Sequence, residues 1–345
     1  MNFIIPSSNY RYLKCLSLFS PKAKRALSLT SGVEPLFLAL RPMIDWDSFK
    51  MMPRKLKKVY RLYSSGAVPL NNKNHGIRLH GFIDFGPRQN QVNYLREVTT
   101  TAKLFQEQIN IAQELAKISG VDDSVFPSVI TIHLGRSSGD LEKEIDNFAR
   151  ACNQVANYAT ARNVIINFEN MCGYFQGKYD VGSDFFDFQK VFSKLDKPEK
   201  FGITFDFSHA MIFYQGDYQK IKNDLVASGV LPHINYLHLT MPHRNYKENK
   251  NIASQKRGLL SSAVNWIYNH PDTHAGLRTF FKHCPEEKQS FWDLFDFLIK
   301  NSKVAAPQFN VINLELGLNV WGTNKGSSAK DVLYTLEQVS SKFKT

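Results

Sequence analysis

Short β-branched or aromatic runs alternate with amphipathic, helix-like stretches from residue 34 to the end of this sequence. This alternation predicts parallel strands joined by crossover helices, because parallel neighbours cannot be joined by a tight turn. The count of eight possible strands indicates a single α/β domain, a (β/α)8 or TIM barrel. The predicted strands are 36–41, 59–64, 77–82, 129–133, 164–169, 202–206, 234–238 and 310–315. The predicted helices include 97–118, 141–159, 184–195, 218–227, 291–299 and 330–342.

The first 33 residues differ from the rest, because they contain five Lys or Arg, six Ser and no acidic residue. This composition is typical of an organelle transit peptide and equally of a disordered basic arm. We therefore expect residues 1–33 to be a leader outside the core and residues 34–345 to form the barrel. The four cysteines are far apart and form no C-x-x-C pair, which favours a reducing, intracellular compartment. That compartment is organellar if the leader is a transit peptide and otherwise cytoplasmic, and we expect a monomer.

The charge balance favours polyanionic partners, since 43 Lys+Arg against 31 Asp+Glu gives a formal charge of +12. No apolar run is long enough to predict a membrane span. A long connection follows the seventh predicted strand and includes a basic insertion at about 243–271. In a barrel this insertion would lie over the active face, although a solvated loop is as common an explanation for such a charge run. Its candidate phosphate contacts are Arg244, Lys247, Lys250, Lys256 and Arg257.

Histidines and carboxylates gather at or just beyond the C-terminal ends of the predicted strands, where barrel enzymes place their chemistry. The set is His80, His133, Glu169, Asp206, His209, His238, Asp272, His274 and Glu315. Glu169 and Glu315 lie among apolar residues, and burying an unpaired carboxylate costs several kcal/mol in rough terms. Bound metal is the simplest shared partner for such a set. Mixed imidazole and carboxylate ligands suit zinc, manganese or iron, and the absence of thiolates points to a catalytic site.

This ordered set, with Glu169-Asn-x-x-Gly, Asp206-x-x-His209 and Asp272-x-His274, resembles the ligand set of endonuclease IV in the xylose isomerase-like barrel superfamily. The resemblance covers about residues 77–317. It implies up to three divalent ions, most typically zinc, and hydrolysis of damaged DNA at an abasic site by attack of a metal-bound hydroxide on phosphorus. By this resemblance His80, His133 and a bridging Glu169 hold one ion. Asp206, His238 and Glu315 complete the second, and His209, Asp272 and His274 hold the third.

Departures from that family concern the substrate side. Phe207-Ser208 precede His209, Thr240-Met241 follow His238-Leu239, and no Arg-x-Trp loop follows the second predicted strand. The ligand set is therefore a firmer prediction than the DNA substrate.

Three other functions remain open. A sugar or sugar-phosphate isomerase or epimerase needs one divalent metal, resembling a site of Glu169, Asp206, His238 and Glu315, with Glu169 and Glu315 as catalytic residues that move protons beside a carbonyl. A multinuclear iron oxidase acting on a peptide is the second, and a non-catalytic binding barrel is the third. The sequence alone favours the DNA hydrolase, since the isomerase does not need His80, His133 and the Asp272/His274 pair as a group.

Overall fold

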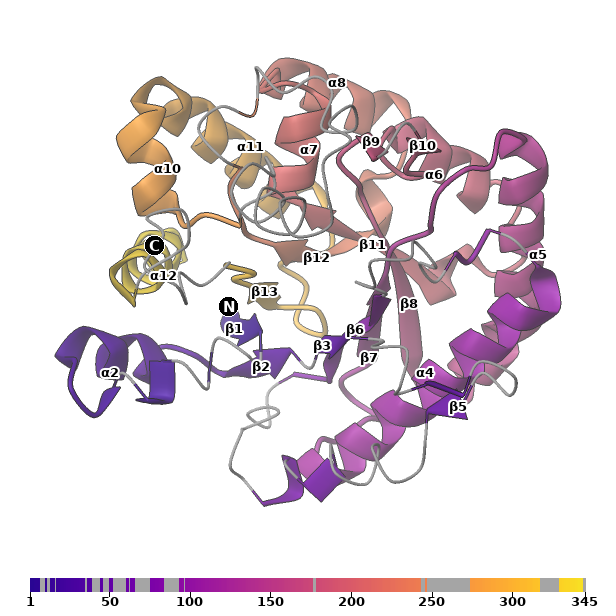
Figure 1. Ribbon diagram of the computed structural model, residues 1–345, viewed down its shortest axis with the longest axis horizontal. Helices are drawn as coiled ribbons and strands as arrows, with labels where there is room; N and C mark the ends of the chain where they lie inside the picture. The colour runs from indigo at the N-terminus through magenta and orange to yellow at the C-terminus, as the bar shows by residue number, and fades with distance from the viewer. Residues whose placement is uncertain are drawn as a thin grey trace, which may run out of the picture.

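The computed structural model describes residues 1–6, 10, 13–15, 17–34, 36–38, 44–45, 50–51, 60–61, 63–65, 75–83, 93–95, 97–175, 178–242, 246, 274–316 and 329–343. A parallel sheet forms the centre, and helices surround it (Figure 1). The strands of this sheet are β1 Asn2–Pro6, β2 Gly32–Glu34, β3 Leu36–Leu38, β6 Arg78–Ile83, β7 Ser128–Ile132, β8 Val164–Glu169, β11 Phe201–Asp206, β12 Ile234–His238 and β13 Val311–Asn313. Two short hairpins lie outside it: β4 Ile44–Asp45 with β5 Lys50–Met51, and β9 Tyr174–Phe175 with β10 Lys178–Tyr179.

The sheet order is β2-β1-β13-β12-β11-β8-β7-β6-β3, and every neighbouring pair is parallel. The two edge strands, β2 and β3, are separated by a single residue in the sequence, so together they act as one strand that links both edges of the sheet. Counted in this way, the sheet has eight parallel strands and forms a nearly closed barrel. The predicted (β/α)8 barrel is confirmed.

The helices are α2 Pro21–Ser28, α4 Val98–Ser119, α5 Leu141–Thr160, α6 Phe185–Phe192, α7 Phe207–Phe213, α8 Tyr218–Ala227, α10 Leu277–His283, α11 Lys288–Asn301 and α12 Ala329–Ser341. Short 3-10 turns lie at Pro198–Lys200, Leu231–His233 and Pro285–Glu287. In α5 the side chain of Asp140 accepts a hydrogen bond from the amide of Lys143 and caps the helix, and Phe148, Cys152 and Val155 face the barrel at helical spacing. None of the described helices is long and apolar enough to cross a membrane.

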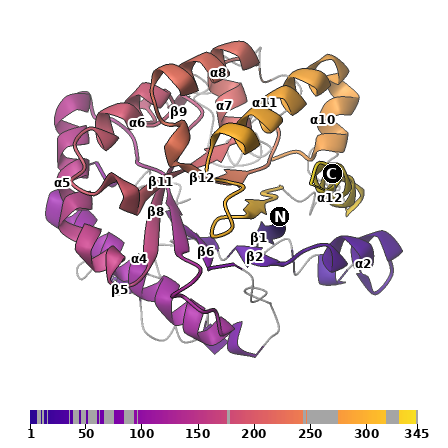
Figure 2. The ribbon, with the colours of Figure 1, turned by 180° about the vertical axis from the view of Figure 1, so that it is seen from behind.

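Two expectations for the N-terminal part are wrong. Phe3, Ile4 and Ile5 are buried, and their strand β1 pairs with β13 and with β2, so the part of residues 1–33 that forms β1 belongs to the barrel wall and not to a leader outside the core. Figure 2 shows this indigo strand beside β13 from behind. A short apolar run is sufficient for a strand buried on both faces, whatever the surrounding composition. The predicted strand at 59–64 is also wrong, because residues 60, 61, 63 and 64 are helical.

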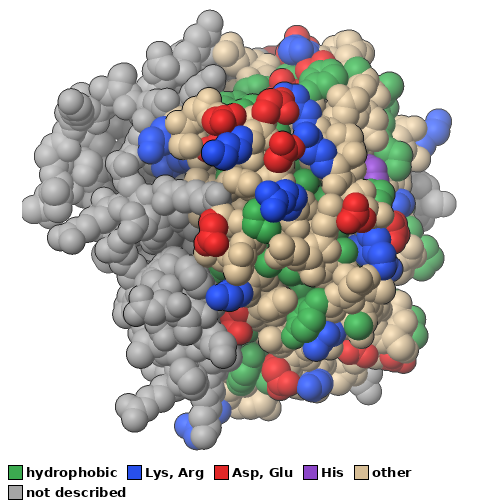
Figure 3. Space-filling model, turned by 90° about the vertical axis from the view of Figure 1, so that its right-hand side faces the viewer, with side chains coloured by type: hydrophobic (Ala, Val, Ile, Leu, Met, Phe, Trp, Pro, Cys, Tyr) green, Lys and Arg blue, Asp and Glu red, His purple; other side chains and the backbone are tan. Residues whose placement is uncertain are grey.

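The face in Figure 3 interleaves Lys and Arg with Asp and Glu. Salt bridges between α5 and α6 also pair opposite charges: the Lys190 Nζ lies 2.7 Å from Glu142 Oε1, and the Lys194 Nζ lies 2.5 Å from Asp146 Oδ1. A surface that binds a nucleic-acid backbone concentrates positive charge instead. This face therefore adds no support for a DNA partner.

The barrel interior is polar, which matters for the site above it. The Asn167 amide donates hydrogen bonds to Thr204 Oγ1 at 3.1 Å and to Asn235 Oδ1 at 2.6 Å, and Thr204 Oγ1 lies 2.8 Å from Thr131 Oγ1. Gly202 provides the room for these side chains. A Cβ at this position would lie 2.3 Å from Asn235 Nδ2 and 2.4 Å from Asn167 Oδ1.

Replacing Gly202 with Ala is therefore expected to lower the free energy of unfolding by about 1–3 kcal/mol, because the buried amides cannot shift without losing their hydrogen bonds. Urea denaturation measures the change. Gly120→Ala is the control: a Cβ there meets no atom within 4 Å, although Gly120 has a φ of 65°. A loss at Gly202 no larger than the loss at Gly120 would contradict the close packing.

Candidate metal centre

Parallel strands bring the candidate ligands to one rim of the barrel. Glu169, Asp206 and His238 are the last residues of β8, β11 and β12, and Glu315 follows the end of β13 by two residues. The register aligns Asp206 with His238, and His238 with Asn313. This rim lies at the C-terminal ends of the strands, where (β/α)8 barrels carry their active sites.

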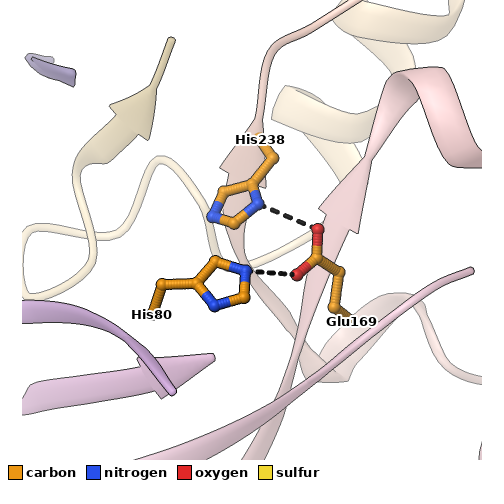
Figure 4. A group of neighbouring side chains, drawn as sticks. All are labelled: His80, Glu169 and His238. Carbon is orange, nitrogen blue, oxygen red and sulfur yellow. Dashed lines mark hydrogen bonds and ion pairs between the residues drawn. The ribbon is translucent and has the colours of Figure 1, made fainter. Parts of the chain in front are cut away.

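Glu169 is the centre of the group. Its Oε1 lies 3.0 Å from His238 Nδ1, and its Oε2 lies 3.3 Å from His80 Nε2 and 3.1 Å from His133 Nε2. Figure 4 shows the side chains of His80, Glu169 and His238 pointing toward one another. Burial acts to raise the pKa of Glu169, but the attraction of His238 and His133 holds that pKa well below its ordinary value. The two imidazoles therefore favour the ionised form of Glu169 although its side chain is fully buried.

Two groups of donor atoms could hold a metal ion among the described residues. One consists of His80, Glu169 and His238, and the other of Glu169, Asp206, His238 and Glu315, with one donor atom from each residue and all atoms within 4.8 Å of one another. The second group gathers three carboxylates around one imidazole. Carboxylates this close repel one another in a buried site unless a cation lies between them. The donor set therefore fits a divalent metal ion.

The imidazole of His238 also balances part of the negative charge of these carboxylates. His238 Nδ1 also lies 2.8 Å from Glu315 Oε2. Burial acts to lower the pKa of His238, but Glu169 and Glu315 raise it well above its ordinary value. Burial acts to raise the pKa of Glu315, while His238 holds it down at about 2. A cation bound here would replace this proton at the same atoms.

The remaining predicted ligands have separate places. His209 Nδ1 lies 2.8 Å from the carbonyl oxygen of Asn170 and 3.7 Å from Glu169 Oε1. His274 Nδ1 lies 3.0 Å from the carbonyl oxygen of Glu315, and the ring centroids of His209 and His274 are 6.3 Å apart. Eight of the nine predicted ligands thus converge on one rim. Asp272 and the five basic residues Arg244, Lys247, Lys250, Lys256 and Arg257 lie outside the described residues.

The candidate ligands differ in their exposure to solvent. The side chain of His133 is 28% exposed and that of Glu315 17%, whereas those of His80, Glu169 and His238 are at most 1% exposed. His133 and Glu315 are therefore more accessible than the three residues below them.

Sequence reasoning missed several polar residues that support the ligands. Asn170 clamps Asp206: its Oδ1 accepts a hydrogen bond from the Asp206 amide at 2.7 Å, and its Nδ2 donates to the Asp206 carbonyl at 2.9 Å. Glu34 on β2 lies 3.4 Å from His238 through its Oε1. A signal for Glu34 was present, since it lies between Val33 and the apolar run 36–38, which is the same argument that drew attention to Glu169.

Arg136 and Asp180 form an ion pair between two loops near this rim, with 3.0 Å between Arg136 Nε and Asp180 Oδ1. Burial raises the pKa of Asp180 to about 6, against the opposing attraction of Arg136. The folded protein therefore binds more protons at Asp180 than the unfolded chain between about pH 4 and pH 6. The stability that Asp180 contributes falls as the pH rises through this window.

We expect wild type to lose stability relative to Asp180→Asn between these pH values, as measured by urea denaturation at each pH. If the unfolding free energy of wild type relative to Asp180→Asn instead stays constant or increases as the pH rises, Asp180 has an ordinary or lowered pKa.

Comparison with known proteins agrees with the geometry. The model of the family "Xylose isomerase-like TIM barrel" matches residues 93–254. A D-tagatose 3-epimerase-like protein superposes with a TM-score of 0.53 at 15% identity over the full length of both chains. The protein crystallised as AsfvAP:AG superposes with a TM-score of 0.50 at 11% identity, over 99% of this chain and 98% of that one. A protein assigned as a sugar phosphate isomerase/epimerase of Anabaena variabilis superposes with a TM-score of 0.51 at 9% identity, over 99% of this chain and 98% of that one.

Among curated proteins, none matches the sequence significantly. At these identities the structural likeness concerns the fold. The chain is thus a single (β/α)8 barrel, similar over residues 93–254 to the xylose isomerase-like TIM barrels, with a cluster of imidazoles and carboxylates at its C-terminal rim that fits a divalent metal ion.

Proposed function

We propose that this protein is a metal-dependent isomerase or epimerase that moves a proton beside the carbonyl group of a small sugar or sugar phosphate. The observation that carries the proposal is the cluster of Glu169, Asp206, His238 and Glu315, whose donor atoms lie within 4.8 Å of one another. This cluster unites the four residues that a one-metal isomerase of this superfamily would use, and it includes two glutamates. The proposal replaces DNA hydrolysis as the leading interpretation.

A divalent cation held by these four residues would polarise neighbouring hydroxyl and carbonyl oxygens of the substrate and acidify the carbon-bound proton between them. The chain's own residues move that proton. Glu315, the more exposed of the two glutamates, receives it as general base, and Glu169 serves as the second carboxylate for return of a proton. His133 borders the opening and can donate a hydrogen bond to a substrate hydroxyl.

The close packing of polar side chains below the rim also suits a sugar substrate. His80, Glu169 and His238 pack on one another at the bottom, with the His80 and His238 rings stacked at 5.8 Å between centroids. A small polar substrate that enters past Glu315 and His133 meets fixed donors and acceptors on the rim. This arrangement favours a molecule with several hydroxyl groups.

The test follows proton transfer directly. The purified protein is stripped of metal, reloaded in turn with Mg²⁺, Mn²⁺, Co²⁺ and Zn²⁺, and incubated in D₂O with a panel of aldoses, ketoses and their phosphates. We expect deuterium incorporation beside the carbonyl, seen by NMR, with at least one metal and sugar. Glu315→Gln should remove the exchange while leaving the fold intact. Absence of exchange across the panel would contradict the proposal.

DNA hydrolysis remains a second candidate because of one observation: both His80 Nε2 and His133 Nε2 approach Glu169 Oε2, at 3.3 and 3.1 Å. A one-metal isomerase does not require this pair. Metal analysis of the purified protein separates the candidates: one divalent ion per chain favours the isomerase, close to three zinc ions favour the nuclease, and two or three iron ions favour the oxidase. Incubation with an abasic-site duplex then tests the nuclease, which is wrong if no strand is cut under several metal and salt conditions.

A further inference from the structure

A fifth buried carboxylate lies behind the proposed metal ligands. Glu34 is 2% exposed, and its Oε1 lies 3.4 Å from His238 Nε2. Two neutral donors hold it in place: the Tyr236 hydroxyl donates to Oε1 at 3.2 Å, and the Asn313 amide donates to Oε2. Glu34 therefore faces the ring of His238 on the side away from Glu169 and Glu315.

The two ring nitrogens of His238 have different neighbours. Nδ1 lies between the carboxylates of Glu169 and Glu315, at 3.0 and 2.8 Å, so it is the nitrogen that faces the metal cluster. A neutral imidazole that binds a cation through Nδ1 carries its proton on Nε2. In a buried site this proton needs an acceptor, and a carboxylate on the outer nitrogen fixes both the tautomer and the orientation of the ring.

We propose that Glu34 is a positioning residue for the metal centre, which accepts the Nε2 proton of His238 and so holds Nδ1 ready for the cation. This inference rests on the proposed one-metal site. By this role strand β2 contributes to the metal centre, and Glu34 is the β2 residue that makes the contact. Glu34 contacts the donor cluster at the outer nitrogen of His238, so we expect it to act through that ring.

Glu34 has a buried cationic neighbour on the side away from His238. Arg78, which is fully buried at the base of the barrel, attracts Glu34 electrostatically, and its guanidinium lies 5.7 Å from the centroid of the Tyr236 ring. Arg78 thus supplies positive charge below Glu34, and the imidazole supplies a proton above it.

The experiment measures metal affinity rather than turnover. Glu34→Gln and wild type are titrated with Mn²⁺ and with Zn²⁺ in competition with a chelating dye, and we expect the variant to bind about 10- to 100-fold more weakly. Glu287→Gln is the matched control, because Glu287 is 4% exposed and accepts a hydrogen bond from the Tyr246 hydroxyl at 3.1 Å in the outer helical layer. The control should bind metal as wild type does.

A second readout separates positioning from loss of structure. Long-range ¹H–¹⁵N spectra of ¹⁵N-histidine protein report which ring nitrogen carries the proton, and the His238 signals are assigned by their loss in His238→Gln. In metal-loaded wild type we expect the proton on Nε2. The milder Tyr236→Phe variant, which keeps the Glu34 carboxylate, should bind metal more tightly than Glu34→Gln.

Unchanged metal affinity in folded Glu34→Gln, or a proton on Nδ1 of metal-loaded wild type, would overturn the role of Glu34 while leaving the proposed function intact. Failure of wild type to bind either metal would instead overturn the proposed one-metal site, and the role of Glu34 with it. Equal destabilisation of the metal-free and metal-loaded variant, with no change in affinity, would show that Glu34 is only structural.

Discussion

Glu169→Gln is expected to reduce metal-dependent proton exchange by about 10³-fold, within the range of about 10²–10⁴ that a general acid or base contributes. Both oxygens of Glu169 face imidazole nitrogens, with Oε1 on His238 and Oε2 on His80 and His133. An amide removes the negative charge and turns one acceptor into a donor. That donor would face a ring nitrogen, so the ligand cluster loses both charge balance and alignment.

The measurement is solvent deuterium exchange at saturating metal, together with metal affinity by dye competition. Glu287→Gln again serves as the control, since it replaces a buried glutamate outside the rim. The far-ultraviolet circular dichroism of Glu169→Gln should match that of wild type. Full activity in this variant would rule out the assignment of Glu169, whatever the substrate.

The central strands of the fold could be predicted from sequence because each is a short, nearly continuous apolar run. The predicted bounds 164–169 and 234–238 coincide with β8 and β12. These strands are buried on both faces, so their hydrophobicity is local information. The rim residues follow directly, because the last residue of a parallel strand must lie at the C-terminal edge of the sheet.

The first strands could not be predicted in the same way. The basic, serine-containing surroundings of the run Phe3–Ile5 predict a leader, and only its pairing with β13, at the other end of the chain, shows that it is a strand. The run at 59–64 has aromatic and β-branched residues that suit a strand, yet its described residues are helical. Tertiary context decides such short segments more than local preference does.

The site, like the fold, could be predicted from the sequence only in part. The positions of its candidate ligands could be predicted, but the residues around them could not, because their contacts join segments far apart in the sequence: Glu34 lies beside His238, Asn170 bonds Asp206, and Asn313 bonds Glu34. The choice between one and several metal ions also depends on distances. Only the structure shows that Glu169, Asp206, His238 and Glu315 form a compact group by themselves.

Arg78→Met is expected to cost about 3–5 kcal/mol of unfolding free energy, the range for removing one partner of a buried charge network. The Arg78 guanidinium closes the base of the barrel by donating to backbone carbonyls. One amino group bonds Gly76, Ile77 and Pro127 at 3.2, 3.3 and 3.1 Å, and the other bonds Phe309 at 3.3 Å and Gln308 at 3.5 Å. Methionine fills much of the volume but leaves these oxygens without their donor.

Urea denaturation gives the change, and Arg25→Ala is the control. The Arg25 guanidinium is 67% exposed and pairs with Glu337 at 2.7 Å on the surface, so its removal should cost at most about 1 kcal/mol. A loss from Arg78→Met no larger than this would show that the carbonyls at the barrel base find other donors.

Because Arg78 also attracts Glu34, the double variant Arg78→Met with Glu34→Gln should lose less stability than the sum of the two single changes. Strict additivity would mean that Arg78 and Glu34 do not interact in the folded protein.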